Sequence, residues 1–190
     1  MPHWEDDPAT YFVTFRLADS FPESARCRIE FERQDIVRTA RAARRPLSRQ
    51  ERIRLSRLFR GKIEIRLDAG AGNCWLAQPE IARISSDSLT HFDGIRYRLL
   101  AWCVMPNHMH VLFRPFDGYH LASIVHAWKS YSAKASNRAL QRSGEFWGRE
   151  YFDHLVRSNA ELDRITRYIL ANPQKAGLRN WPWVHASANS

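Results

Sequence analysis

The chain has 190 residues, 44% of them hydrophobic, and a formal net charge of +9, which predicts one domain with a packed core and a polyanionic partner. Its three cysteines are scattered, and their number and spacing exclude a disulfide framework or a cysteine metal motif. Neither a signal sequence nor an apolar run of membrane-spanning length is present, so we expect a soluble cytoplasmic protein without membrane contacts.

The first third of the chain predicts one strand and two helices. Aromatic residues and threonine alternate over 11–17, as in a half-buried strand. Charged residues with a thin apolar stripe predict a helix over roughly 24–44. Ser48 to Glu51 match a capping box, so a second helix should begin there and reach about residue 65.

The segment 24–67 is strongly basic. Between Arg26 and Arg66 lie 14 of the chain's 29 basic residues, against five acidic ones. Two interpretations stay open: a solvated helical face, or a flank that follows a phosphate backbone without sequence preference. We interpret 1–190 as a single domain in which 24–67 is an insertion.

The rest of the chain mixes strands and helices. Two apolar runs joined by the turn residues Pro106-Asn107 predict a hairpin, and such a tight turn requires an antiparallel pair. We therefore predict an α+β fold, with an antiparallel central sheet of four or five strands flanked by helices. The predicted elements are a short helix from Pro79, hairpin strands over 97–104 and 108–113, a helix over 120–140, a strand over 145–156, a helix ended by Pro173, and a packed edge or loose end from Trp181 on.

The second hairpin strand carries two histidines. Alternation places His108 and His110 on one face of this strand and Met109 on the other. Two imidazoles at this spacing can converge on one divalent ion. The alternative is a pair of half-buried histidines with no shared role.

A tyrosine and an asparagine follow on the last predicted helix. Tyr168 and Asn172 are four residues apart, so they lie on one helix face, one turn from each other. Pro173 should end the helix and hold Asn172 in its last turn. Both side chains could then reach a two-histidine metal site; the alternative is a half-buried tyrosine beside a helix-ending asparagine.

Two distant segments together resemble the motifs of one family. They are residues 104–110, VMPNHMH, and residues 168–178, YILANPQKAGL. They resemble the REP-associated tyrosine transposases, which are single-tyrosine HUH transposases related to the IS200/IS605 group. Residues 12–17 (FVTFRL), 128–131 (WKSY) and 146–153 (FWGREYFD) are also similar to segments of that family, so the resemblance runs from about residue 10 to 180.

The resemblance implies a fold and a reaction. The fold would be an HUH nuclease core with a ferredoxin-like or RRM-like sheet. Tyr168 would attack single-stranded DNA that carries REP-type palindromic hairpins, leaving a 5′-phosphotyrosyl link and a free 3′-hydroxyl. His108, His110 and Asn172 would be the metal ligands. This branch also implies a monomer without a small-molecule cofactor, associated with the nucleoid when bound to DNA.

The chemistry of these residue types agrees with a divalent metal. A phenol titrates near 10, so a tyrosine that attacks a phosphodiester needs help at the phosphorus and at the leaving oxygen. Two imidazoles and one amide leave a site open to substrate oxygens and water, which suits Mg²⁺ or Mn²⁺ better than a structural zinc centre. Tyr131 is the alternative nucleophile, ranked second because Ala135, four residues on, cannot assist a metal.

Other residues are candidates for contacts with DNA. We expect backbone phosphate contacts from Lys129, Arg142, Arg149 and Lys175. Tyr131 and Trp147 are candidates for stacking on unpaired bases, with packing in the core as the alternative for each. Trp128, on the apolar face of its helix, is assigned to packing.

Three functions compete. The first is a metal-dependent DNA endonuclease and strand transferase, favoured by the joint presence of His108, His110, Tyr168 and Asn172. The second is a hairpin-binding or single-strand-binding protein with the same fold and no catalysis, which the charge would suit equally well. The third is a structural metal protein or a phosphoesterase that uses activated water, for which Tyr168 would be dispensable.

Overall fold

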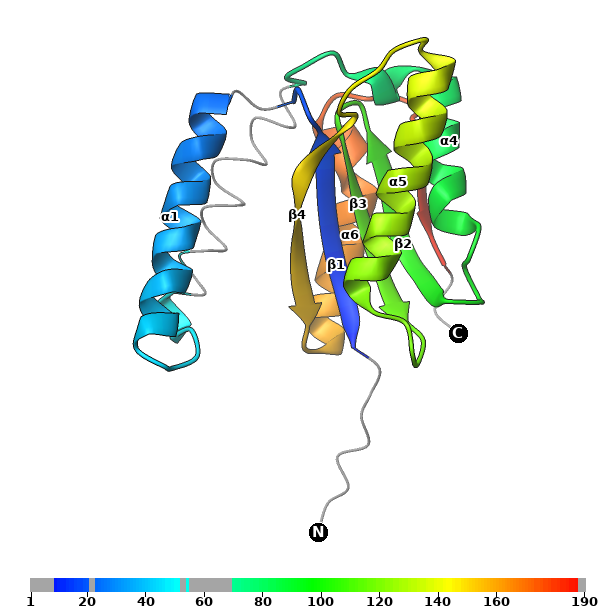
Figure 1. The fold of residues 1–190 in the computed structure, drawn as a ribbon. Helices are drawn as coiled ribbons and strands as arrows, with labels where there is room; N and C mark the ends of the chain where they lie inside the picture. The colour runs from blue at the N-terminus through cyan, green and yellow to red at the C-terminus, as the bar shows by residue number, and fades with distance from the viewer. Residues whose placement is uncertain (1–8, 21–22, 52–53, 55–69, 188–190) are drawn as a thin grey trace. The chain divides into compact units, whose positions relative to one another are not determined.

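A computed structural model of the chain describes residues 9–20, 23–51, 54 and 70–187 (Figure 1). Its contacts divide the chain into two compact units, one formed by Met1–Ala18 with Cys74–Ser190 and the other by Asp19–Asn73. The predicted insertion, 24–67, falls inside the second unit. The interpretation of 1–190 as one domain stays a prediction, and we describe each unit by itself.

The larger unit contains a five-stranded sheet in which every neighbouring pair is antiparallel, in the order β4-β1-β3-β2-β5. The predicted α+β class is therefore confirmed. The expected packed edge after Trp181 is β5, which pairs with β2. The strands are β1 (Thr10–Leu17), β2 (Tyr97–Met105), β3 (His108–Pro115), β4 (Trp147–Val156) and β5 (Val184–Ala186).

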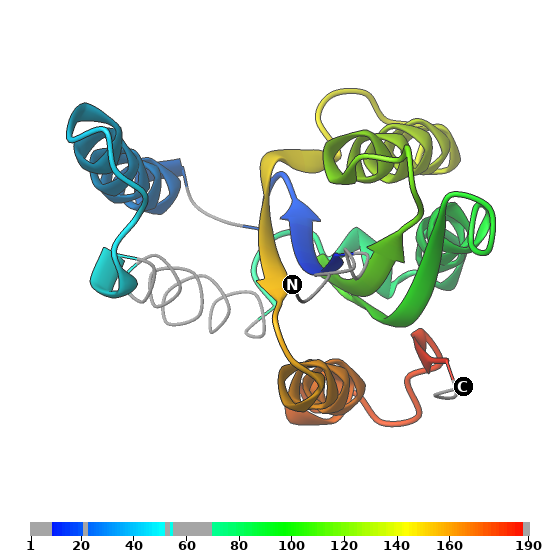
Figure 2. The ribbon, with the colours of Figure 1, turned by 90° about the horizontal axis from the view of Figure 1, so that it is seen from below.

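Helices cover both faces of this sheet (Figure 2). Helices α4 (Pro79–Thr90) and α5 (Leu121–Ala139) lie on one face, and α6 (Asn159–Lys175) lies on the other. A short 3-10 helix, η2 (Trp75–Ala77), precedes α4. Within the part of the chain that the structure describes, no helix is long and apolar enough to cross a membrane.

Strand alternation divides the core into two clusters. Phe15, Val111 and their strand neighbours of the same parity pack beneath α4 and α5. Phe12 and Leu112, of the opposite parity, pack with Ile169 and its neighbours on α6. The cluster beneath α6 is the smaller one, and it shares its sheet face with the predicted metal ligands.

A bulge in β2 changes which side chains face each cluster. The pairing with β3 passes from Leu99 opposite Phe113 to Ala101 opposite Leu112, so Leu100 is an extra residue. Before the bulge, odd-numbered residues of β2 face α4 and α5, whereas after it Cys103 and Met105 face α6. One inserted residue thus reverses the alternation within the strand.

Helix α6 corrects one prediction. Pro173 lies inside the helix, which continues to Lys175 instead of ending at the proline. Proline removes one backbone donor, but its fixed φ is helical, so the helix can run on for half a turn. Asn172 is still in the last turn, as expected.

The smaller unit begins with α1 (Glu23–Ala42), which agrees with the helix predicted over 24–44. The predicted capping box is confirmed, because the Ser48 amide donates to Glu51 Oε2 at 2.7 Å and the Glu51 amide donates to Ser48 Oγ at 3.2 Å. Most of the helix predicted to follow, to residue 65, lies outside the described residues.

Candidate active site

Two histidines meet at the start of β3, on the sheet face that α6 covers. His108 and His110 are both fully buried, and their Nε2 atoms are 3.1 Å apart. Their rings meet edge to face with centroids 4.7 Å apart. The two imidazoles therefore share one face of the sheet, as strand alternation predicted, and lie close together.

The other ring nitrogen of each histidine has a partner. His108 Nδ1 lies 2.7 Å from Asn107 Oδ1, and a carboxamide oxygen can only accept, so Nδ1 carries the proton and Nε2 keeps its lone pair. His110 Nδ1 lies 2.7 Å from Thr14 Oγ1 on the neighbouring strand β1. A hydroxyl both donates and accepts, so Thr14 suits either tautomer of His110.

Burial keeps this pair neutral. Removal from water lowers the pKa of His108 to about 3, and burial with the nearby His108 lowers the pKa of His110 well below its usual value. At neutral pH both rings are therefore uncharged, which is the form that binds metal ions.

Tyr168 of α6 reaches the histidine pair. Its phenol oxygen is 3.3 Å from His110 Nε2, and the two rings are 5.3 Å apart between centroids. Phe12 lies against both of them: its ring stacks on His110 at 5.5 Å and meets Tyr168 edge-on at 6.1 Å. The helix and the hairpin, 58 residues apart in sequence, thus place a tyrosine beside two imidazoles.

Asn172 lies one helical turn beyond Tyr168 and is 2% exposed. Its Oδ1 is buried and has no hydrogen-bond partner among the described residues. Leaving a buried amide oxygen unpaired costs about 1–3 kcal/mol, a cost that a bound cation would remove.

These donors fit a divalent cation. Two ligands that bind an octahedral ion about 2.1 Å away at right angles are about 3.0 Å apart, and the two Nε2 atoms are separated by 3.1 Å. In the described part of the chain, no group of three histidine, cysteine or acidic side chains could hold a metal. The candidate set is therefore His108, His110 and Asn172, which leaves coordination positions for substrate oxygens and water.

The two aromatic candidates for DNA contact lie in different environments. Trp147 is in the core, 6% exposed, and its Nε1 donates to Ser132 Oγ at 2.8 Å, so the packing interpretation holds for this residue. Tyr131 is 60% exposed on α5, so packing in the core is wrong for it. Trp128 is buried, as predicted.

The four basic candidates also differ. Lys129 Nζ donates to the carbonyls of Gly148 and Arg149, both at 2.8 Å. Arg142 donates to Asn137 Oδ1 at 3.0 Å, and exposed Arg149 pairs with Glu145 at 3.1 Å. Lys175 is the one nearest the site, with Nζ 5.4 Å from the centre of the Tyr168 ring.

Thr14 and Phe12 were missed as site residues. Both lie in a segment that resembled the family, but no local pattern links a threonine to a histidine 96 residues away. The signal that could have found them is strand alternation in β1. Once the pairing register is known, the even-numbered residues of β1 lie on the same sheet face as the even-numbered residues of β3.

Comparisons with known proteins found similarity to transposases. The family model described as "Transposase IS200 like" matches residues 84–172, the range that holds the hairpin and the tyrosine helix. A Haemophilus influenzae protein, provisionally named a REP-associated tyrosine transposase, is 25% identical over 101 residues, covering 46% of this chain and 57% of the relative. The chain thus matches little more than half the length of that relative.

A solved structure of a REP-associated tyrosine transposase bound to a REP hairpin aligns with a TM-score of 0.46 and 17% identity, covering 97% of this chain and 82% of that one. The family match rests on the sequence comparison, which includes both histidines and the tyrosine helix. Residues 84–172, just under half of this chain, are thus similar to the family of IS200-like transposases.

Proposed function

We propose that the protein is a metal-dependent single-strand DNA endonuclease and strand transferase, a transposase that acts on REP-type hairpins through a 5′-phosphotyrosyl intermediate. One observation carries the proposal: the Tyr168 phenol lies 3.3 Å from the Nε2 of His110, within a neutral histidine pair. The buried Oδ1 of Asn172 on the same helix, which no described residue pairs with, supports a third metal ligand.

Each residue has a role in this chemistry. The Tyr168 oxygen forms a bond to phosphorus as the bond from phosphorus to the 3′ oxygen breaks, and the phenolic proton is lost while the 3′ oxygen leaves as a hydroxyl. Phe12 holds the rings of Tyr168 and His110 in place. A divalent ion, Mg²⁺ or Mn²⁺, when held by His108, His110 and Asn172, would polarise the phosphate. One phosphodiester replaces another, so a 3′-hydroxyl can reverse the step and join strands.

The contact between Tyr168 and His110 is made within one chain, which supports a site completed by a monomer. The basic composition and the family match support a DNA partner in the cytoplasm. Lys175, beside the Tyr168 ring, is the basic residue best placed to meet a phosphate near the reacting bond.

The test incubates the full chain with labelled single-stranded hairpin DNA from repeats flanking its own gene, with and without Mn²⁺. Denaturing gels then report any covalent protein–DNA adduct. We expect a metal-dependent adduct that Tyr168→Phe abolishes. Tyr131→Phe is the matched control, since it alters the exposed tyrosine of α5 and should leave the adduct unchanged.

Two results would contradict the proposal. Hairpin binding without any adduct, over several hairpins and metals, would favour the binding protein without catalysis. Cleavage that survives Tyr168→Phe would favour hydrolysis by activated water.

A further inference from the structure

Three exposed arginines lie in the last turn of α1 and in the segment that follows it, in the smaller unit. Arg41, Arg44 and Arg49, here called the basic turn, are all exposed. None of the three makes an ion pair or a side-chain hydrogen bond with any described residue. Their charges are therefore available to a partner.

The acidic side chains described around the basic turn are already paired. Asp35 accepts from Arg38 at 3.1 Å, and Glu32 accepts from Arg54 at 2.9 Å. Glu51 lies 2.7 Å from Arg45. The positive charge of the basic turn is thus not balanced by these carboxylates.

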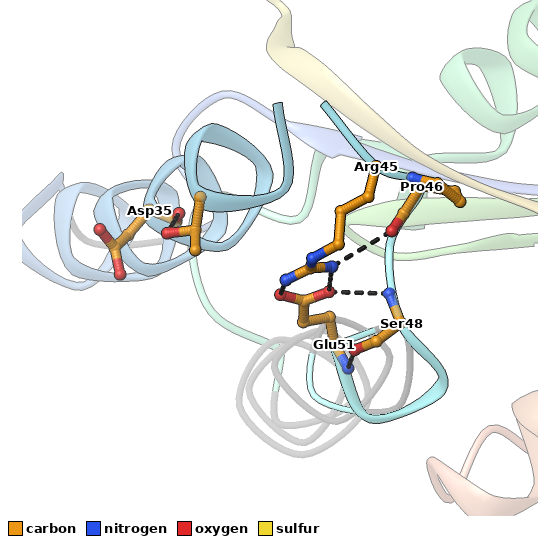
Figure 3. Close-up of polar contacts among 6 residues, drawn as sticks. Asp35, Arg45, Pro46, Ser48 and Glu51 are labelled. Atoms are coloured by element: carbon orange, nitrogen blue, oxygen red, sulfur yellow. Dashed lines mark hydrogen bonds and ion pairs between the residues drawn. The ribbon is translucent and has the colours of Figure 1, made fainter. Parts of the chain in front are cut away.

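Hydrogen bonds hold the backbone of the basic turn in one conformation (Figure 3). The two Arg45 Nη atoms donate to the two carboxylate oxygens of Glu51 at 2.7 and 2.8 Å, and Nη1 also donates to the Pro46 carbonyl at 3.2 Å. The hydrogen bond from Arg45 lowers the pKa of Glu51 to about 2. With the capping box of Ser48 and Glu51, these bonds pre-order the turn before any ligand arrives.

Arg44 occupies a position that normally favours glycine. Its φ is 50°, in the left-handed region. Its amide donates to the Arg41 carbonyl at 2.9 Å, and the next amide, of Arg45, donates to the Ala40 carbonyl at 3.2 Å. This is a Schellman motif with arginine where glycine is commonest. A cationic side chain thus occupies a backbone conformation that has a cost for any residue other than glycine.

We propose that the basic turn binds the phosphate backbone of the duplex stem of a DNA hairpin, without sequence preference. A pre-ordered set of cations suits a rigid duplex, which presents one phosphate charge per about 1.7 Å of axis. The inference rests on the proposed function for its hairpin substrate, but it does not depend on the chemistry at Tyr168.

The experiment measures the affinity of the full chain for a fluorescent DNA hairpin between 50 and 200 mM salt. The salt slope is the steepness with which log affinity falls as log salt concentration rises, and each lost phosphate contact lowers it by about 0.9. The change in affinity between the two salt concentrations then becomes about 3.5-fold smaller. Arg41→Gln/Arg49→Gln should therefore reduce it by about 12-fold. Arg38→Gln/Arg54→Gln removes the same charge from paired arginines and should leave the slope unchanged. Equal slopes for the two double variants would overturn the inference.

Arg44→Gly separates binding from stability. Glycine relieves the left-handed backbone, so the melting temperature should rise by about 2–4 °C. The same variant should lower the salt slope by about 0.9, because one phosphate contact is lost. A salt slope and an affinity that both equal those of the unaltered chain would contradict the inference.

Two further comparisons test whether the basic turn contacts duplex or single-stranded DNA, and whether its binding depends on the reaction at Tyr168. If an unpaired oligonucleotide of equal length shows the same loss of slope, the basic turn contacts single strands and the assignment to the stem is wrong. If the unaltered chain forms no covalent adduct but Arg41→Gln/Arg49→Gln still lowers the slope, the proposed reaction fails and this inference stands.

Discussion

Two buried polar clusters on opposite faces of the sheet differ in how fully their atoms are hydrogen-bonded. Beneath α4 and α5, Tyr97 donates its hydroxyl to the Leu89 carbonyl at 2.6 Å and accepts from Trp128 Nε1 at 2.7 Å. Trp147 donates to Ser132 Oγ at 2.8 Å, and that hydroxyl donates to the Trp128 carbonyl at 2.6 Å. We call Tyr97, Trp128, Ser132 and Trp147 the closed network, because every donor in it has an acceptor.

The site beneath α6 is open by comparison. His108 Nε2 keeps a lone pair that points at His110, and Asn172 Oδ1 has no partner among the described residues. Polar groups that satisfy one another stabilise a core, whereas a buried amide oxygen without a partner costs stability unless a ligand is bound. Buried atoms without a partner among the described residues also occur beneath α4 and α5, at Ser85 Oγ, Ser136 Oγ and Trp102 Nε1, so the contrast lies between these two clusters and not between the whole faces. The proposed metal ligands are in the cluster that is not fully hydrogen-bonded.

The largest expected effect is on the closed network. Trp128→Ala should lower the free energy of unfolding by about 3–5 kcal/mol, because it removes a fully buried ring and the donor to Tyr97. Urea unfolding at pH 7 measures it. Tyr131→Ala, at an exposed position of the same helix, should change that free energy by less than about 0.5 kcal/mol. A loss below about 2 kcal/mol for Trp128→Ala would contradict the structural role.

The site beneath α6 and the closed network should also lose stability at different pH values. Burial lowers the pKa of His108 to about 3, so without metal its contribution is present above about 6.5 and falls as the pH drops towards 3. The pKa of His110 is lowered too, so its contribution is lost in the same direction. Burial raises the pKa of Tyr97, so its contribution is present below about 10 and is lost as the pH rises further. Chelator-treated protein should therefore unfold more easily at both extremes.

Tyr97→Phe separates these two arms of the pH profile. It removes the titrating phenol, so the alkaline loss should shrink while the acid loss stays the same. Urea unfolding at a series of pH values measures both arms. An acid arm that changes together with the alkaline arm would show that the two regions do not titrate independently.

Variants of Thr14 test whether its hydroxyl orients the ring of His110. Thr14→Val removes the hydroxyl that contacts His110 Nδ1. Loss of such a partner typically costs 10- to 100-fold in metal affinity, which Mn²⁺ titration followed by electron paramagnetic resonance would measure. Thr14→Ser keeps a hydroxyl and should retain most of the affinity. Equal affinities for the two variants would remove Thr14 from the site.

The smallest expected effect is a gain in the free energy of unfolding, not a loss. Asn172→Leu replaces a buried amide, whose oxygen has no partner among the described residues, by an apolar side chain of similar size, so metal-free protein should gain about 1 kcal/mol of unfolding free energy. The same variant should lose Mn²⁺ binding. Ser132→Ala, in the closed network, should instead lose about 1 kcal/mol. A loss of stability in Asn172→Leu would mean that its oxygen has a structural role.

Much of the site could be predicted because its residues are tied to local patterns. The spacing of His108 and His110 on a strand, and of Tyr168 and Asn172 on a helix, determines which side chains share a face. Strand and helix periods are properties of the backbone, so both pairs were placed before any tertiary contact was known.

The missed features depend on contacts between distant segments. Whether Leu100 forms a bulge depends on the register with β3, and whether Thr14 meets His110 depends on which strand lies next to β3. Pro173 stays inside α6 because its imide φ is compatible with helix, which a rule that proline ends helices does not capture.

The sequence by itself therefore determined the antiparallel hairpin, the two candidate pairs and the resemblance to a transposase family, since these follow from short-range periodicity and from motif residues. Tertiary structure alone decided that the pairs meet, with the Tyr168 phenol 3.3 Å from His110, and that Trp147 lies in the core while Tyr131 is exposed. The physical reason is that strand order and register set distances between residues far apart in the chain, and these depend on how the whole sheet packs against its helices.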